Sequence, residues 1–223
     1  MPLVLWDIDH TLIDTRGVGR ELSAAAFERA TGCPMREQAK IDGITERVIF
    51  RETAKLHGLA TNPADFQRFA EALTDEHLNH LGDLRERGHA LPGAAAILNA
   101  LDAQEVRQTV VTGNIRPVAE LKLQVFGLDS PIQWDVGAYG EEHDNRAELV
   151  RLSLQRACTP STNAVLVGDT PADIEGAHTN GVRVIAIASG HSDEATLKAA
   201  GAEIVLPDLR NTELLLKLVR DDI

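Results

Sequence analysis

The chain has 223 residues, of which 43% are hydrophobic and 25% are charged. This length suits one large domain, or a main domain that carries a smaller one, with a sizeable core. The formal net charge of −12 argues against a nucleic-acid-binding surface, which needs basic residues to neutralise phosphates. No apolar stretch approaches the roughly 20 residues that cross a membrane, and no basic leader precedes the first apolar run, so we expect a cytoplasmic protein without a membrane partner.

Short apolar runs along the chain predict the buried strands of a parallel sheet. They occupy residues 3–6, 108–111, 164–167, 182–187 and 204–206, with a weaker run at 134–138. Each is continuous rather than alternating, as expected where helices cover both faces of a sheet. Helical patterns lie between them at residues 93–102, 116–126, 146–156 and 172–180. This alternation predicts an α/β fold with a doubly wound, mainly parallel, Rossmann-like sheet.

Residues 16–90 interrupt this alternation. Three stretches, at 20–30, 44–59 and 66–81, repeat apolar residues near the i+3 and i+4 spacing of an amphipathic helix. No convincing strand pattern occurs among them. We therefore predict a small all-helical domain at 16–90, inserted after the first strand, with a catalytic α/β core formed by 1–15 and 91–223.

Polar residues and one glycine follow three of the predicted strands. They are Asp7 and Asp9 after the first strand, Thr112, Gly113 and Asn114 after the second, and Asp169 and Asp173 after the third. The carboxyl ends of parallel strands meet at one edge of a sheet, so these residues should converge. Convergent carboxylates repel one another unless protons or a metal ion intervene, and Mg²⁺ is the ion that prefers such oxygen ligands.

The Thr-Gly-Asn turn adds a hydroxyl and backbone N–H groups at a helix N-terminus, which suits a phosphoryl group. A carboxylate nucleophile beside a metal ion and an anion site indicates phosphoryl transfer through an aspartyl-phosphate.

Three motifs in this order carry a family resemblance. "DIDHTLIDT", "VVTGN" and "GDTPADIEGA" resemble motifs I, II and IV of the haloacid dehalogenase superfamily, and the helical insertion resembles its C1 cap. The resemblance spans nearly the whole chain and points to the phosphoglycolate phosphatase branch. The dehalogenases themselves lack the second aspartate of the first motif, so the presence of Asp9 favours a phosphate substrate.

The resemblance implies a role for each motif residue. Asp7 would be the nucleophile, and Asp9 the general acid and base, with its main-chain carbonyl on Mg²⁺. Thr112 and the Asn114 amide would contact the phosphoryl oxygens. Asp169 would bind the metal ion directly, and Asp173 would bind it directly or through water.

The third motif of the family usually supplies a lysine, and here the chain differs. Arg146 in "EEHDNRAELV" stands at the aligned place and keeps the positive charge, but its planar group differs from an ammonium. Lys122 is the nearby alternative, and we expect it on a solvated helix face. His57, His77, His80 and His89 are expected at the surface of the insertion rather than in a metal site.

The insertion should supply the residues that select the substrate. Ile44, Thr45 and Arg47, in "DGITERV", are the candidates, although a helix N-cap explains Thr45 equally well.

Together these features predict a Mg²⁺-dependent phosphomonoester hydrolase acting on a small phosphorylated metabolite. A β-phosphoglucomutase-like phosphomutase is the alternative within the same chemistry. A receiver-like or other non-catalytic phospho-ligand-binding module is the alternative from another class. The identity of the substrate and the oligomeric state cannot be predicted from these residues.

Overall fold

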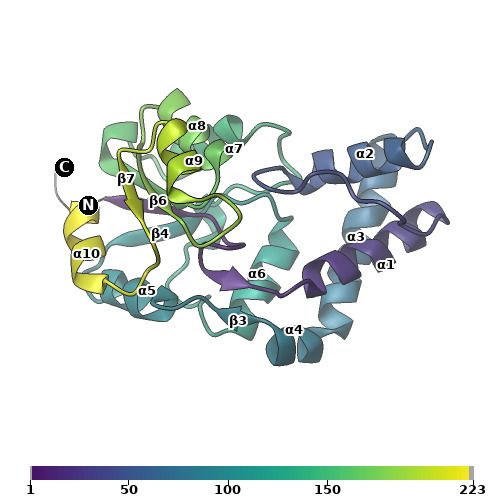
Figure 1. Ribbon diagram of the computed structural model, residues 1–223, viewed down its shortest axis with the longest axis horizontal. Helices are drawn as coiled ribbons and strands as arrows, with labels where there is room; N and C mark the ends of the chain where they lie inside the picture. Colours follow the sequence, from purple (N-terminus) through teal and green to yellow (C-terminus); the bar gives the residue numbers. More distant parts are fainter. Residues whose placement is uncertain (1, 221–223) are drawn as a thin grey trace.

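A computed structural model describes residues 2–220 of the chain, and a parallel sheet lies at its centre (Figure 1). The strands are β1 (Leu3–Trp6), β4 (Arg107–Val110), β5 (Ala164–Gly168), β6 (Arg183–Ile187) and β7 (Ile204–Leu206). Their order across the sheet is β4-β1-β5-β6-β7, and every neighbouring pair is parallel. Leu5 of β1 pairs with Thr109 on one side and Leu166 on the other. The five predicted strands are confirmed to within a residue or two.

Helices cover both faces of this sheet, which confirms the doubly wound α/β class. One face packs on α5 (Ala94–Asp102), α6 (Arg116–Val125) and α10 (Thr212–Arg220). The opposite face packs on α7 (Arg146–Arg156), α8 (Pro171–Thr179) and α9 (Glu194–Ala199). Successive residues of β1 alternate between these layers, since Val4 belongs to the first and Leu5 to the second. Continuous apolar runs are therefore required, because both faces of each strand are buried.

The weak run at 134–138 does not form a strand, so that part of the prediction is wrong. It contains a 3-10 helix, η1 (Trp134–Val136), and only Ala138 makes a bridge, to Val111. The Tyr139 hydroxyl donates to the Trp134 carbonyl at 2.5 Å and holds the chain in this turn. A second 3-10 helix, η2 (Ser161–Asn163), precedes β5.

A set of helices lies between β1 and the rest of the sheet in sequence. It contains α1 (Val18–Thr31), α2 (Glu46–Leu56), α3 (Pro63–Asn79) and α4 (Leu81–Arg87), which we call the helical insert. The chain leaves the core through β2 (Ile13–Asp14) and returns through β3 (His89–Ala90), and these two short strands pair antiparallel. Figure 1 shows the insert beside the sheet rather than against either of its faces.

The helical insert has a core of its own. The rings of Phe50 and Phe69 stack at 4.7 Å between centroids, and Phe27 meets Phe50 edge-on at 6.0 Å. Ile115 and Val118, beside and within the first turns of α6, complete this cluster from the core side. Helix α6 therefore ties the insert to the sheet. Among the described residues, no helix combines the length and apolar character needed to cross a membrane.

Gly93 provides a test of how the insert returns to the core. It precedes α5 with a φ of +93°, and a Cβ there would lie 2.1 Å from the Leu209 carbonyl oxygen. Gly58 also has a positive φ, of +70°, but has no atom within 4 Å of its Cβ position. Backbone strain of about 1–2 kcal/mol applies to alanine at both sites, whereas overpacking of about 1–3 kcal/mol applies only at Gly93.

We therefore expect Gly93→Ala to lower the free energy of unfolding by about 3 kcal/mol and Gly58→Ala by about 1 kcal/mol. Urea denaturation of both variants measures this difference. Equal losses would show that the segment around Leu209 yields without cost.

Candidate active site

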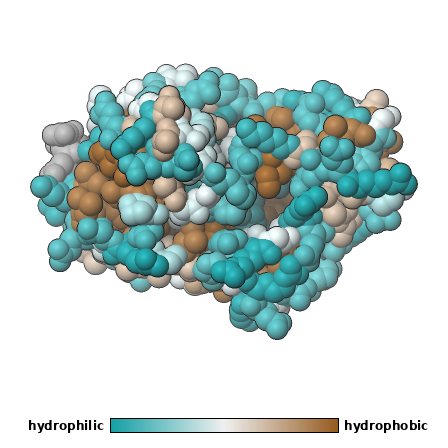
Figure 2. Space-filling model, viewed as in Figure 1, coloured by the Kyte–Doolittle hydropathy of each residue, from teal (hydrophilic) through white to brown (hydrophobic). Residues whose placement is uncertain are grey.

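A cavity of about 150 Å³ lies where the carboxyl ends of β1, β4 and β5 face the helical insert. Residues of both parts line it, and the space-filling view shows the surface hollowed between them (Figure 2). Open parallel sheets bind ligands at this edge because several strand-to-helix turns converge there. The predicted strand-end residues of all three motifs meet at this cavity or directly behind it.

Asp7, Asp169 and Asp173 form a buried group that we call the acidic cluster. One carboxylate oxygen of each lies within 4.8 Å of those of the others, and no side chain is more than about one-twentieth exposed. The Asp7 N–H donates to the Val167 carbonyl at 2.9 Å, which extends the β1–β5 pairing to this residue. Asp173 lies in the first turn of α8, where it forms a capping box with Thr170. The capping box thus fixes the position of Asp173, and the pairing of β1 with β5 fixes that of Asp7.

Arg146 is the cation of the acidic cluster and is itself buried. Its Nη2 donates to Asp7 Oδ1 at 2.7 Å and lies 2.9 Å from Asp173 Oδ1. Its Nη1 donates to the Val111 carbonyl at 3.1 Å. Burial alone would lower the pKa of Arg146, but the carboxylates of Asp173 and Asp7 outweigh burial and raise it. The guanidinium therefore stays charged between two carboxylates, at the place predicted for the third-motif cation.

One guanidinium does not balance three carboxylates. Burial, followed by the neighbouring negative charges, raises the pKa of Asp169. Burial likewise raises the pKa of Asp7, although Arg146 opposes the change. Both effects favour the protonated form of these carboxyl groups where no further cation is present. The Thr11 hydroxyl donates to Asp169 Oδ1 at 3.2 Å, which is a small compensation.

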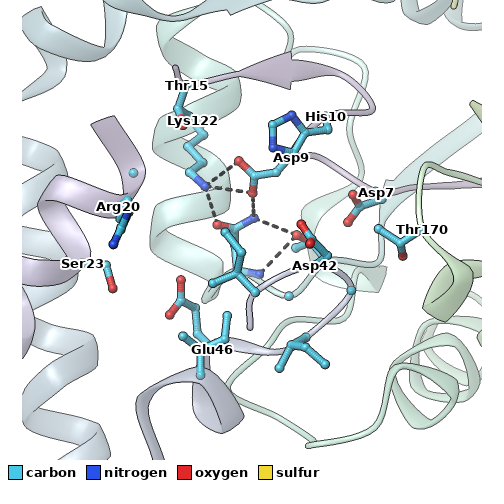
Figure 3. Close-up of a pocket in the computed structure, with 18 of the residues that line it drawn as sticks. Asp7, Asp9, His10, Thr15, Arg20, Ser23, Asp42, Glu46, Lys122 and Thr170 are labelled. Carbon is cyan, nitrogen blue, oxygen red and sulfur yellow. Dashed lines mark hydrogen bonds and ion pairs between the residues drawn. The ribbon is translucent and has the colours of Figure 1, made fainter. Parts of the chain in front are cut away.

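Asp9 has a cation of its own, and this corrects the prediction for Lys122. The Lys122 ammonium is buried, lies 2.8 and 2.9 Å from the two Asp9 oxygens, and donates to Asn114 Oδ1 at 2.7 Å (Figure 3). The Asn114 amide also donates to Asp9 Oδ2 at 2.7 Å. We call Asp9, Asn114 and Lys122 the Asp9 cluster. Burial opposes ionisation of Asp9, but the charge and hydrogen bonds of Lys122 outweigh it and lower the pKa of Asp9.

The spacing of Lys122 from the apolar residues of its helix could have predicted that it is buried. Val118 and Ala119 are buried in α6, and Lys122 follows them by four and three residues on the same face. A lysine on the apolar face of this helix is buried, and a buried ammonium needs a negatively charged partner inside the protein.

The Thr-Gly-Asn turn lies between the acidic cluster and the insert. Both Asn114 amide hydrogens are directed within the site, toward Asp9 Oδ2 and toward Thr112 Oγ1 at 2.9 Å. The Gly113 carbonyl accepts from the Glu46 N–H at 2.8 Å, and a Cβ on Gly113 would lie 2.4 Å from the Ile44 carbonyl oxygen. Glycine is required here because the backbone of the insert approaches so closely.

The three predicted substrate-selecting residues have different positions. Ile44 lines the cavity. Thr45 occupies the N-cap position of α2 but makes no capping hydrogen bond, and its buried hydroxyl has no partner among the described residues. Arg47 does not line the cavity and lies 3.6 Å from Asp144 at the rim between insert and core.

His77 is buried rather than at the surface, which corrects a second prediction. Its side chain is 2% exposed, lines the cavity, and follows Phe69 and Leu73 on the apolar face of α3. This spacing of four residues, repeated from Phe69 to Leu73 to His77, could have predicted that His77 is buried. Burial, with a smaller contribution from the Lys122 charge, lowers the pKa of His77 to about 4. Ser23, which no motif marks, lines the same cavity, as does Glu46, which lies in "DGITERV" but was not among the predicted residues.

The pKa of His77 predicts a pH-dependent contribution to stability. An unfolded histidine takes up a proton near pH 6.5, whereas folded His77 does so only near pH 4. The unfolded state therefore binds more protons between these values, and acidification through this window favours unfolding. From pH 7 to pH 4.5, we expect His77 to lower the free energy of unfolding by about 2 kcal/mol.

Replacement by glutamine isolates this effect. Denaturant unfolding at both pH values should show that His77→Gln loses about 2 kcal/mol less than the wild type on acidification. His178→Gln, at an exposed position of α8, serves as the control and should lose as much as the wild type. An identical loss in wild type and His77→Gln would contradict the burial of an uncharged imidazole.

Comparisons with known proteins agree with this geometry. PpaX of Caldanaerobacter subterraneus, a provisionally named pyrophosphatase, is 26% identical over 190 residues, 82% of this chain and 80% of that protein. A phosphoglycolate phosphatase of Rhodospirillum rubrum is 34% identical over 119 residues, about half of each chain. The solved structure of a hydrolase from Pseudomonas syringae superimposes with a TM-score of 0.72 at 21% identity, over 98% of this chain and 99% of the other.

These likenesses confirm the expected resemblance to phosphoglycolate phosphatases and the expected fold. The family model described as haloacid dehalogenase-like hydrolase matches residues 4–187, which include every motif of the site. The chain therefore belongs to the haloacid dehalogenase-like hydrolase family.

Proposed function

We propose that this protein hydrolyses phosphate monoesters of small metabolites through a phosphorylated Asp7. The observation that carries the proposal is the separation of the two first-motif aspartates. Asp7 contacts Arg146 in the acidic cluster, while Asp9 contacts Lys122, so two carboxylates of one strand end have different surroundings. Two nearby carboxylates that are held by different cations on different helices can take different chemical roles.

Asp7 is suited to attack phosphorus. Its carboxylate lies at the cavity, and Arg146 holds one of its oxygens and adds positive charge beside the position of a phosphoryl group. Among residues 2–220, no carbonyl accepts the backbone N–H of Asp9 or Gly113. These N–H groups, with the Thr112 hydroxyl near the start of α6, form an anion site for the phosphoryl oxygens.

Asp9 is suited to the proton transfers. It would enter the first step as the carboxylic acid and give its proton to the departing alkoxide as the bond to phosphorus breaks. The carboxylate left behind would later take a proton from the water that hydrolyses the aspartyl-phosphate, which restores the acid. The contact with Lys122 favours the ionised form, which is the form that the second step needs. Because the Asn114 amide is directed at Asp9, we propose that Asn114 positions this residue rather than binding the phosphate as the motif resemblance implied.

The acidic cluster fits a Mg²⁺ ion. It offers three converging carboxylates with one guanidinium among them, so negative charge is in excess where the carboxylates are ionised. Asp7, Asp169 and Asp173 would hold the ion, which offers oxygen-ligand chemistry and neutralises phosphate charge. The Asp9 carboxylate is directed away toward Lys122, so only its main-chain carbonyl remains a predicted ligand.

We further propose that residues 16–90 act as the cap of this site. The Glu46–Gly113 backbone hydrogen bond, the Arg51–Asp144 ion pair at 2.6 Å and the His191–Asp42 contact at 2.9 Å join insert to core around the cavity. A closed insert would exclude bulk water while Asp7 is attacked.

Variants of the two aspartates test the proposal. Asp7→Asn should remove turnover of p-nitrophenyl phosphate, because the nucleophile is lost while the shape is kept. Asp9→Asn should lower kcat/KM for an alkyl phosphate by about 10²–10⁴-fold, and for p-nitrophenyl phosphate much less, because p-nitrophenolate leaves without a proton. It should also release a burst of p-nitrophenol as phosphoenzyme accumulates.

Asp102→Asn, at an exposed position of α5, is the matched control and should behave as the wild type. Substantial activity in Asp7→Asn would refute covalent catalysis by Asp7. Equal losses of kcat/KM for both substrates in Asp9→Asn, without a burst, would remove Asp9 from the acid–base role. Phosphoryl transfer to a second alcohol without release of inorganic phosphate would favour the phosphomutase alternative.

A further inference from the structure

Each of three insert helices places at least one polar side chain at the wall of the cavity. Ser23 comes from α1, Glu46 from the first turn of α2, and His77 from α3. Figure 3 shows the Glu46 carboxylate and the Ser23 hydroxyl directed into the space that Lys122 and Asp9 border from the other side. The mechanism proposed above uses none of these three groups. They lie on the side of the cavity where Asp9 would protonate a leaving alcohol.

His77 is a hydrogen-bond acceptor without a donor. Its Nδ1 lies 2.8 Å from the Leu73 carbonyl oxygen, and because a carbonyl only accepts, Nδ1 carries the ring hydrogen. Nε2 of the uncharged ring is then an acceptor. It is buried and has no partner among the described residues. A buried polar atom left unpaired costs free energy, so a ligand that donates to it gains affinity.

Glu46 presents a second acceptor of the same kind. Its Oε2 is buried without a hydrogen-bond partner in the described chain. The backbone N–H of the same residue donates to the Gly113 carbonyl at 2.8 Å, which fixes the start of α2 beside the cavity. Burial raises the pKa of Glu46 to about 7, as expected for a carboxylate that lacks a donor.

No side chain among residues 2–220 donates to Glu46 Oε2 or His77 Nε2. The three hydrogens of the Lys122 ammonium are engaged by the two Asp9 oxygens and by Asn114 Oδ1. Arg20 also lines the cavity, but it is an exposed residue of α1. A molecule that fills the cavity and carries hydroxyl groups can supply the missing donors.

We propose that Glu46 and His77 bind hydroxyl groups of the leaving alcohol, so that the preferred substrates are phosphate monoesters of polyols or sugars. This proposal rests on the phosphatase function proposed above and assigns its substrate class. The Ser23 hydroxyl, which can donate or accept, adds a third contact. A cavity of about 150 Å³ holds a phosphoryl group and a short hydroxylated chain. A leaving group with a carboxylate, such as glycolate, would place hydrogen-bond acceptors and a negative charge against His77 Nε2 and the Glu46 carboxylate, which are themselves acceptors. Such a leaving group is therefore disfavoured.

Matched substrates test this selection in the wild-type protein. We would compare glycerol 1-phosphate with propyl phosphate, a pentitol phosphate with pentyl phosphate, and both pairs with phosphoglycolate. The expected result is a kcat/KM for at least one polyol phosphate about 10- to 100-fold above that of its alkyl counterpart, with phosphoglycolate no better than the alkyl esters.

Variants assign the effect to the two acceptors. Glu46→Leu and His77→Leu should each reduce the polyol-to-alkyl ratio toward one, and Glu46→Gln, which keeps one acceptor oxygen, should give an intermediate ratio. Glu52→Leu on α2 and His80→Leu after α3 lie outside the cavity lining and should keep the wild-type ratio. The wild-type ratio decides the question by itself if a leucine variant does not fold.

Polyol-to-alkyl ratios of kcat/KM near one, or phosphoglycolate as the best substrate, would overturn the proposed preference for polyol and sugar phosphates. If p-nitrophenyl phosphate were still hydrolysed, the phosphatase function would stand. A wild-type preference unchanged in Glu46→Leu and His77→Leu would overturn the assignment to these residues. Absence of hydrolysis of every monoester would overturn the phosphatase function, and this proposal with it.

Discussion

The structure depends on the way in which charge is balanced at one edge of the sheet. Asp7, Asp9, Asp169 and Asp173 converge there, and among residues 2–220 Arg146 and Lys122 are the only lysine or arginine side chains that form ion pairs with them. In a low-dielectric site such an excess of negative charge is costly unless protons or a further cation reduce it. The family membership, the proposed metal ion and the proposed chemistry are all consistent with this single constraint.

The doubly wound sheet supplies its two cations from opposite faces. Arg146 is the first residue of α7, on one face, and reaches the acidic cluster. Lys122 lies in the last turn of α6, on the other face, and reaches Asp9. Two aspartates separated by one residue can therefore have different partners, because each points toward a different helical layer. Helix α6 also contacts the insert, so the same element that positions Lys122 supports the wall carrying His77.

Sequence reasoning succeeded where a pattern has one physical cause. Apolar runs such as 164–167 had to be buried strands, and strand ends in a parallel sheet had to meet, so Asp7 and Asp169 could be brought together in advance. It failed where tertiary contacts decide. Lys122 and His77 are polar residues on apolar helix faces. The carboxylate that pairs with Lys122 lies 113 residues away in sequence, and the cavity beside His77 is formed by residues from distant parts of the chain. Residues 134–138 have strand composition but are held in a turn by Tyr139.

The most direct test of the account is calorimetric titration of the purified protein with Mg²⁺ at pH 7, repeated in two buffers of different protonation enthalpy. Because burial and mutual repulsion raise the pKa of Asp7 and Asp169, these groups hold protons until a cation replaces them. The account predicts that Mg²⁺ binds with release of protons to the buffer, and that Asp169→Asn weakens binding and reduces the release. Failure of Mg²⁺ to bind, or binding with the same heat in both buffers, would contradict it.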